Sequence, residues 1–370
     1  MASQILPSIN RAVAALSPPP AVLSEDYDGL QYSWWFLVFR PALFKNELFL
    51  LGGALFYLAF YWFGSRANAS KANAWLNAHL PLYAKHFSRP TEGGLTSDGY
   101  SDFFNFSTGR RLVASLHTVF TLRPRHDLLQ YIYQTGWTLI DLNYAPKDEI
   151  TLDFKLTLSA STPDFVWALV AKNELVSIRK ERWDLTFTRT TEHAALPAFV
   201  TVFSEFADIT DAVLKLAGPV VEALKDPKIQ PYFRSLSITD QPSAHPTSLP
   251  YAHEKHVLLT LRALPHSQAA LSEPLVAAVF TLIDALERVS LRPETKTKLK
   301  KVREELLKSL KEESEKEARE EAADAKAAAK KKAEEERIAG LSAAEQQKIL
   351  DRDRKRNIRK SQSKVSSKAR

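Results

Sequence analysis

One stretch of the chain is apolar without interruption, LFLLGGALFYLAFYWF at residues 48–63. As a helix, the 20 residues from Asn46 to Ser65 would reach about 30 Å, which is roughly the hydrocarbon thickness of a bilayer. A buried core helix has the same pattern, but the rest of the body is rich in charge, so we predict a transmembrane helix over residues 47–65. The residues assigned to this span are Leu48, Leu51, Gly52, Leu55, Leu58 and Phe63.

The sequence next to this stretch does not orient it. Arg40 and Lys45 on one side are balanced by Arg66 and Lys71 on the other, so the positive-inside rule gives a tie. Residues 1–24 hold only the five-residue apolar run AVAAL before three prolines, which argues against a cleaved signal peptide. Two glycosylation sequons, which begin at Asn68 and Asn105, offer a test, because a glycan on Asn105 would place the body in the lumen.

The pattern changes after the span and predicts an α+β domain over residues 66–291. In residues 70–88 the apolar side chains recur at helical spacing, which indicates a helix at the bilayer surface; they are Ala72, Trp75, Leu76, His79 and Leu80. Strands are predicted in RRLVASLHTVFTL, EITLDFKLTL, DFVWALVA, WDLTFTRT, AFVTVF and HVLLTLRAL. Helices are predicted in KNELVSIRKE, around Ile209, Val213 and Leu216, and in PLVAAVFTLIDALERV, which would pack on the sheet.

A helical tail is predicted over residues 292–370. A short apolar seam that could dock or pair as a coiled coil lies at its start, formed by Leu299, Val302, Leu306 and Leu310. Beyond Leu310 the composition is Ala, Glu and Lys, which supports a solvated helix to Gly340. Over residues 293–339 this helix would be roughly 70 Å long. Ser342 and Glu345 have capping-box spacing, so a second helix would follow.

Charge divides the chain into two parts. Residues 291–370 carry 25 Lys and Arg against 16 Asp and Glu, a net of +9, while residues 1–290 carry a net of −2. Such a tail binds polyanions, either nucleic acid or an anionic lipid surface. The tail contains no aromatic residue that could stack on a base, which is consistent with recognition of RNA by shape and charge. The cations assigned to this polyanion-binding segment are Arg352, Arg354, Lys355, Arg356, Arg359, Lys360, Lys364, Lys368 and Arg370.

Catalytic and metal-binding patterns are weak in this sequence. There is no cysteine, which excludes disulfides, thiolate zinc sites and cysteine nucleophiles, and neither a P-loop nor a nucleophile elbow occurs. His253 and His256 are three residues apart, whereas the zinc-peptidase helix requires four. The short acidic group of Glu25, Asp26 and Asp28 has too few ligands for a calcium cage. We therefore expect a protein that is not an enzyme and has no cofactor or metal.

The order of these parts resembles the calumin family of endoplasmic reticulum coiled-coil proteins, subunits of the PAT chaperone complex, in its fungal form. The resemblance covers most of residues 47–370 and depends on four segments, within which Gly109-Arg110 and Asp127-Leu128-Leu129 fall as in the family. These segments are KANAWLNAHLPLYAKHFS, FFNFSTGRRLVASLHTVFTLRPRHDLLQYIY, LPAFVTVFSEFADITDAVL and EEERIAGLSAAEQQKILDRDRKRNIRK.

The resemblance implies a single-pass protein of the endoplasmic reticulum membrane with a luminal N-terminal segment over residues 1–46 and a cytosolic C-terminus. It implies a non-enzymatic adaptor and chaperone subunit for multipass membrane protein biogenesis. The implied partners are the ribosome, through rRNA phosphates near the tunnel exit, the Sec translocon, the small membrane protein Asterix and nascent multipass proteins. Two alternatives stay open: a structural tether that binds anionic lipid through its tail, and a factor in calcium homeostasis of the endoplasmic reticulum. The family's long acidic luminal segment is reduced here to Glu25, Asp26 and Asp28, which argues against calcium storage.

Overall fold

The computed structural model describes residues 29–339, except 36, 42–44, 142–143, 145, 158–161 and 247–253. These residues form two units, an α+β body that ends at Thr295 and a long helix that continues from Lys296. The α-helices are α2 (Lys45–His86), α3 (Leu128–Ile140), α4 (Leu175–Glu181), α5 (Ala207–Leu216), α6 (Gly218–Lys225), α7 (Glu273–Ala285) and α8 (Pro293–Ala339). Short 3-10 helices are η2 (Lys172–Glu174), η3 (Asp184–Phe187), η4 (His266–Ser272) and η5 (Leu286–Arg288).

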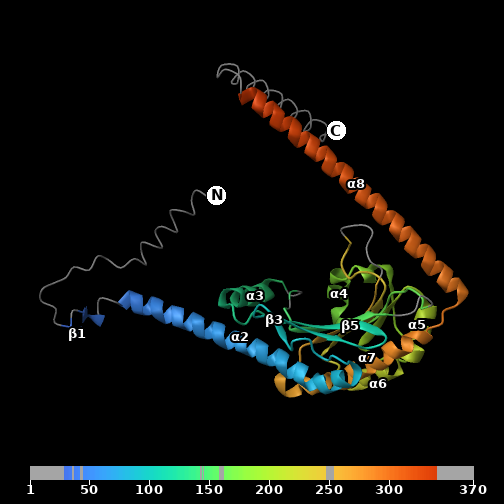
Figure 1. Cartoon of the computed structure of the whole chain (residues 1–370), viewed down its shortest axis with the longest axis horizontal. Coiled ribbons are helices and arrows are strands. Elements are labelled where there is room, and N and C mark those ends of the chain that lie inside the picture. Colours follow the sequence, from blue (N-terminus) through green and yellow to red (C-terminus); the bar gives the residue numbers. More distant parts are fainter. Residues whose placement is uncertain are drawn as a thin grey trace. The chain divides into compact units, whose positions relative to one another are not determined.

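The body is built on one nine-stranded sheet (Figure 1) in the order β3-β4-β5-β6-β11-β10-β7-β9-β8, and every paired neighbour is antiparallel. Its strands are β3 (Thr96–Asp98), β4 (Asp102–Thr108), β5 (Val113–Thr121), β6 (Glu149–Leu156), β7 (Trp167–Ala171), β8 (Arg189–Thr191), β9 (Val200–Ser204), β10 (Phe233–Thr239) and β11 (Lys255–Arg262). A separate hairpin of β1 (Tyr32–Trp34) and β2 (Leu37–Phe39) precedes α2. The predicted α+β class is confirmed.

The sheet is covered on both faces at one end and on one face at the other. All five residues of β7 and of β9 are buried, whereas β6 alternates buried and half-buried residues, as its polar and apolar alternation predicts. Phe280 of α7 contacts Phe154 of β6 at a ring-centroid distance of 5.4 Å, so α7 packs on the sheet as predicted. Ala168 of β7 and Val166, which directly precedes this strand, pack in one cluster with Ile178 of α4.

Helix α2 differs from its prediction. The sequence predicts a span that ends near Ser65 and a separate helix at the bilayer surface, but the structure has one helix of 42 residues. Its second half is part of the core of the body: Trp75 is 1 % exposed, and its indole Nε1 donates to Ser272 Oγ at 2.9 Å. The ring of Trp75 stacks on His79 at 3.7 Å, and burial lowers the pKa of His79 to about 4. The apolar residues at helical spacing therefore face protein and not the bilayer surface.

Other elements also differ from the sequence predictions. The segment WDLTFTRT is not one strand: it forms η3 and then the short strand β8. The sequence patterns did not identify α3, β4 or β10. The tail prediction is correct in one respect, because α8 is a single helix of 47 residues from Pro293 to Ala339. Pairing as a coiled coil stays a prediction, and the proposed helix after Gly340 lies outside the described residues.

The glycosylation test of orientation is weaker than the sequence indicates. Asn68 is fully buried and donates to the carbonyl oxygens of Tyr100 and Arg123, each at 3.0 Å. Asn105 is 1 % exposed on β4 and donates to Ser107 Oγ at 3.1 Å. Because neither side chain can carry a glycan in the folded body, an unglycosylated chain would not establish which side of the membrane the body occupies.

Candidate membrane interface

The first half of α2 is a largely exposed apolar surface that contacts the body near its end, through Phe60 and Tyr61. Among the residues assigned to the span, Leu48 is 69 % exposed, Leu55 57 % and Phe63 65 %, and Gly52 has open space around its Cα. Leu51 and Leu58 are likewise exposed. In the part of the chain that the structure describes, two helical segments are long and apolar enough to cross a membrane, and the second, at 266–288, is mostly buried in the body. The exposed half of α2 is thus the candidate span, because so large an exposed apolar surface is typical of a membrane contact.

The helix meets the body at Gly64. A Cβ atom at this position would lie 1.9 Å from the carbonyl oxygen of Arg125, so the loop that precedes α3 crosses α2 in direct backbone contact. Only glycine permits so close an approach. Residues N-terminal to Gly64 form the exposed apolar half, and residues from Asn68 onward enter the core. Gly64 therefore marks the level at which the candidate span ends and the body begins.

A charged cluster fixes this junction, with Asp148 at its centre. The Asp148 carboxylate, 9 % exposed, accepts from Lys71 Nζ at 2.6 Å, from Arg125 Nη2 at 2.7 Å and from the backbone N–H of Arg123 at 2.9 Å. Arg125 Nη1 also donates to Asn68 Oδ1 at 2.9 Å. Burial alone would raise the pKa of Asp148, but the hydrogen bonds from Arg125, Arg123 and Lys71 outweigh it and lower the pKa to about 2. The cluster ties α2 to the loop before α3.

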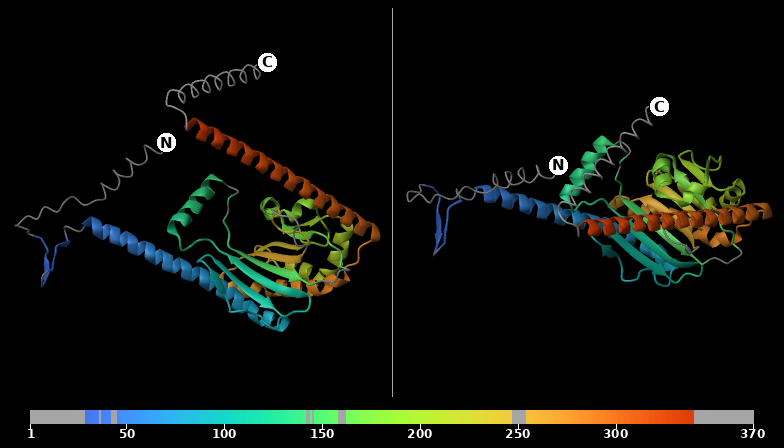
Figure 2. Two further views of the ribbon diagram at one scale, coloured as in Figure 1. Left: turned by 45° about the horizontal axis from the view of Figure 1, so that its top comes forward. Right: turned by 90° about the horizontal axis from the view of Figure 1, so that it is seen from above.

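Helix α3, one of the elements that the sequence patterns did not identify, begins at this junction. Asp127 caps it, accepting from the backbone N–H groups of Leu129 at 3.0 Å and Gln130 at 3.1 Å. Its first turn contacts the candidate span through Tyr131, whose ring lies 6.2 Å from that of Phe60. No residue of α3 is buried, and no residue of it is charged. Figure 2 shows α3 projecting away from α2 instead of running beside it.

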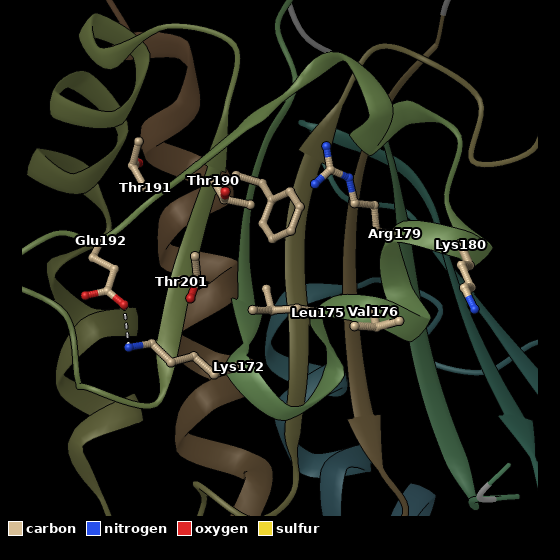
Figure 3. Close-up of a pocket in the computed structure, with 10 residues that line it drawn as sticks. Lys172, Leu175, Val176, Arg179, Lys180, Thr190, Thr191, Glu192 and Thr201 are labelled. Atoms are coloured by element: carbon tan, nitrogen blue, oxygen red, sulfur yellow. Dashed lines mark ion pairs between the residues drawn. The ribbon is translucent and has the colours of Figure 1, made fainter. Parts of the chain in front are cut away.

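A groove lies elsewhere on the body, between α4 and the edge strand β8 (Figure 3), with a volume of about 560 Å³. Lys172 and Glu192 point toward each other across one end of it, with Nζ and Oε1 2.6 Å apart. Arg179 and Lys180 project from α4. The described lining residues include no pairing of a nucleophile with a base.

The other predicted site residues fall as follows. His256 pairs with Asp153, Nδ1 to Oδ1 at 2.6 Å, and this hydrogen bond raises the pKa of His256. Within the described residues there is no group of three or more His, Asp or Glu side chains that could hold a metal. The acidic group at Glu25, Asp26 and Asp28, His253, and all nine cations assigned to RNA binding lie outside the described residues.

These features define a class of protein: an α+β body whose own core helix extends outward as a candidate membrane anchor. Comparison with known proteins identifies the family, since the family model for PAT complex subunit CCDC47 matches residues 43–360. The chain belongs to this family, as the resemblance in the sequence predicted. The match therefore covers α2, the body, α8 and part of the cationic segment that follows α8.

Two relatives support the assignment. A UPF0674 endoplasmic reticulum membrane protein of Schizosaccharomyces pombe is 25 % identical over 336 residues, which cover 86 % of each chain. The PAT complex subunit CCDC47 of Xenopus laevis is 24 % identical over 303 residues, which cover 74 % of this chain and 58 % of the frog protein. The similarity to the fungal protein therefore extends over most of both chains.

Proposed function

We propose that this protein is a single-pass subunit of a PAT-type complex in the endoplasmic reticulum membrane, with its body and tail on the cytosolic side. It acts without a reaction of its own, as a ribosome- and translocon-associated adaptor and chaperone subunit for multipass membrane proteins. Its partners are the ribosome, the Sec translocon, a small membrane protein of the Asterix type and the nascent client. Membership of the CCDC47 family supports this role.

One structural observation carries the proposal: α2 passes without a break from an exposed apolar half into the core of the body. Because the helix is continuous, the anchor and the body move as one rigid piece. The cluster around Asp148 and the stacked Trp75 and His79 hold its second half in place. A flexible linker would let the body drift from the bilayer, whereas this helix holds the body at the membrane surface.

The tail supplies the reach and the charge for ribosome binding. Helix α8 has 47 residues, a length of roughly 70 Å at about 1.5 Å per residue. Beyond it, residues 351–370 carry nine cations and two anions. Several cations that meet the phosphates of folded RNA release counterions together, so the resulting affinity falls steeply as salt rises. We assign the ribosome contact to this terminal segment.

The proposal is tested by co-sedimentation of the full-length protein, in mild detergent, with purified ribosomes. Reversal of four tail cations to Glu is expected to abolish capture at moderate ionic strength, because each reversal replaces an attraction with a repulsion. The control reverses four exposed lysines of α8 and so changes the net charge equally. The tail variant carries Glu at Arg352, Lys355, Arg356 and Arg359, and the control carries Glu at Lys298, Lys300, Lys308 and Lys311.

Two outcomes would overturn the proposal. If the tail variant sediments like the wild type, this segment is not the contact. If the wild type prefers anionic vesicles to ribosomes at equal ionic strength, the tail binds lipid and the protein is a membrane tether, since salt sensitivity alone does not distinguish the two polyanions.

A further inference from the structure

Helix α3 is amphipathic, but its apolar half is exposed while its more polar half lies toward the body. At about 100° per residue its apolar side chains occupy one half of the circumference. Among them, Leu129 is 71 % exposed, Leu139 82 % and Ile140 75 %. The half-buried positions are instead Leu128 and the more polar Tyr131, Gln134 and Thr138. The apolar half is Leu128, Leu129, Ile132, Tyr133, Trp137, Leu139 and Ile140.

We infer that α3 lies in the membrane interface beside the span, with this apolar half in the acyl chains of the leaflet that faces the body. Water is a poor solvent for such a surface, and the rest of the described body buries no residue of α3. The helix carries no charged side chain, so nothing on it opposes entry into the interface. Trp137 and Tyr133, which stack at 5.9 Å, have the amphipathic rings that favour the headgroup level.

The position of α3 along α2 indicates that lipid covers the apolar half of α3. Phe60 and Tyr131 are in contact, and Gly64 touches the carbonyl oxygen of Arg125, so α3 starts at the last turn of the apolar half of α2. A helix that leaves a span at this level and projects away from it (Figure 2) runs into the interfacial layer of the same bilayer. The apolar surface of α3 is thus continuous with that of the candidate span.

Charge at the base of α3 agrees with this placement. Arg66 lies over the Trp62 ring at 5.6 Å, and Arg123 lies over the Tyr131 ring at 4.8 Å. Trp62 belongs to the last turn of the apolar half of α2, and Tyr131 contacts Phe60 of the same half. The two guanidinium groups therefore lie near the end of this half, at the level that lipid phosphates would occupy, and the apolar half of α3 would lie on the hydrocarbon side of that level.

The absence of cysteine from the chain makes a direct test possible with single-cysteine variants of the full-length protein. Each variant carries a nitroxide spin label and is reconstituted into vesicles of equal parts phosphatidylcholine and phosphatidylserine. Collision rates with oxygen, which concentrates in lipid, and with a water-soluble nickel chelate report the depth of the label. The labelled positions on α3 are Ile132→Cys, Leu139→Cys and Ile140→Cys on the apolar half and Gln130→Cys on the polar half.

Two controls calibrate the measurement. Leu58→Cys reports the span itself, and Val176→Cys reports an apolar side chain of α4 that is 69 % exposed on the body and is expected to contact water. The three apolar-half labels are expected about 5–10 Å below the phosphate level, with Gln130→Cys at or above it. A Leu139→Glu change, at a position too exposed to disturb the fold, should move the Ile132→Cys label to water.

The inference is overturned if the apolar-half labels behave like Val176→Cys, because α3 would then be in water. It is also overturned if they are shielded from both reagents, because a second copy of the chain would then cover the helix. The inference depends on α2 as the anchor, and the two fail in distinguishable ways. A Leu58→Cys label in water rejects the anchor, whereas a Leu58→Cys label in lipid with α3 in water rejects only the interfacial helix.

Discussion

Substitution of Asp148 by Asn tests how firmly the candidate anchor helix α2 is joined to the body. Asp148 follows the stretch after α3 and pairs with Lys71, which lies on α2 beyond the candidate span, and with Arg125, which lies in the loop before α3. Asn has the same shape but no charge. The change therefore leaves two half-buried cations next to a neutral side chain without altering the packing volume.

The loss of stability caused by Asp148→Asn follows from the pKa of Asp148 and from the burial of its ion pairs. The pKa of Asp148 falls from 3.8 to about 2 in the folded protein, and at about 1.4 kcal/mol per unit this corresponds to about 2–3 kcal/mol of stability at neutral pH. Breaking a fully buried ion pair costs about 3–5 kcal/mol. Because the side chains of Lys71 and Arg125 are 23 % and 30 % exposed, water compensates part of that loss. We expect a destabilisation of about 2–3 kcal/mol.

The assay is thermal unfolding of the full-length protein in detergent, followed by near-ultraviolet circular dichroism. For a body of this size the expected loss lowers Tm by about 5–10 °C. The matched control is Glu254→Gln, because Glu254 accepts from Lys155 at 2.6 Å, as Asp148 does from Lys71, but both partners are more than 40 % exposed. Such a surface pair contributes less than about 1 kcal/mol. If Asp148→Asn costs no more than Glu254→Gln, the cluster does not hold the junction.

The stability that the Asp148 carboxylate contributes depends on pH. A carboxyl group whose pKa is lowered by folding contributes its stability above its unfolded pKa and loses it as the pH falls toward its folded pKa. The difference in stability between the wild type and Asp148→Asn should therefore be constant above about pH 5 and shrink as the pH falls from about 4 to about 2. A difference that grows on acidification would contradict the assignment.

Two further predictions concern packing. Gly64→Ala should cost about 1–3 kcal/mol and shift a spin label on α3, because the new Cβ would displace the carbonyl of Arg125, whereas Gly53→Ala, with open space around it, should be neutral by the same thermal assay. Phe280→Ala should cost about 3–5 kcal/mol in chemical unfolding, because the ring is fully buried and contacts Phe154; a cost below about 1 kcal/mol would show that α7 is not part of the core.

Part of the body could be predicted because several of its strands, such as β5, β6 and β11, bury mainly alternate residues. In β6 the apolar Ile150, Leu152 and Phe154 are buried and their polar neighbours are not, which is the pattern that the sequence displays. The helix α8 could be predicted from composition alone, since alanine and paired charges need no partner. Such elements depend on local sequence, so they can be predicted from one sequence alone.

The elements that were missed depend on their surroundings. The continuity of α2 was not predicted, because the apolar run ends near Ser65 and Asn68 looks like a surface residue in the sequence. In the structure Asn68 is buried and donates to carbonyl oxygens of distant segments. Helix α3 was not identified, although its apolar side chains recur at helical spacing, and the sequence could not show that the body leaves its apolar half exposed. The signal was present: Asp127 at the cap position and 13 following residues without a charge. An exposed apolar helix is not expected in a water-soluble α+β domain, but it is expected next to a membrane span.

The central claim, that α2 crosses the bilayer and places the body and tail in the cytosol, is tested most directly by labelling in sealed endoplasmic reticulum microsomes. Single cysteines at Ser33, before α2, and at Ser309, on α8, are exposed to a maleimide polymer that cannot cross membranes. The account predicts that Ser309→Cys reacts in intact microsomes and that Ser33→Cys reacts only after detergent. Protection of Ser309→Cys in intact microsomes, or reaction of both cysteines without detergent, would contradict it.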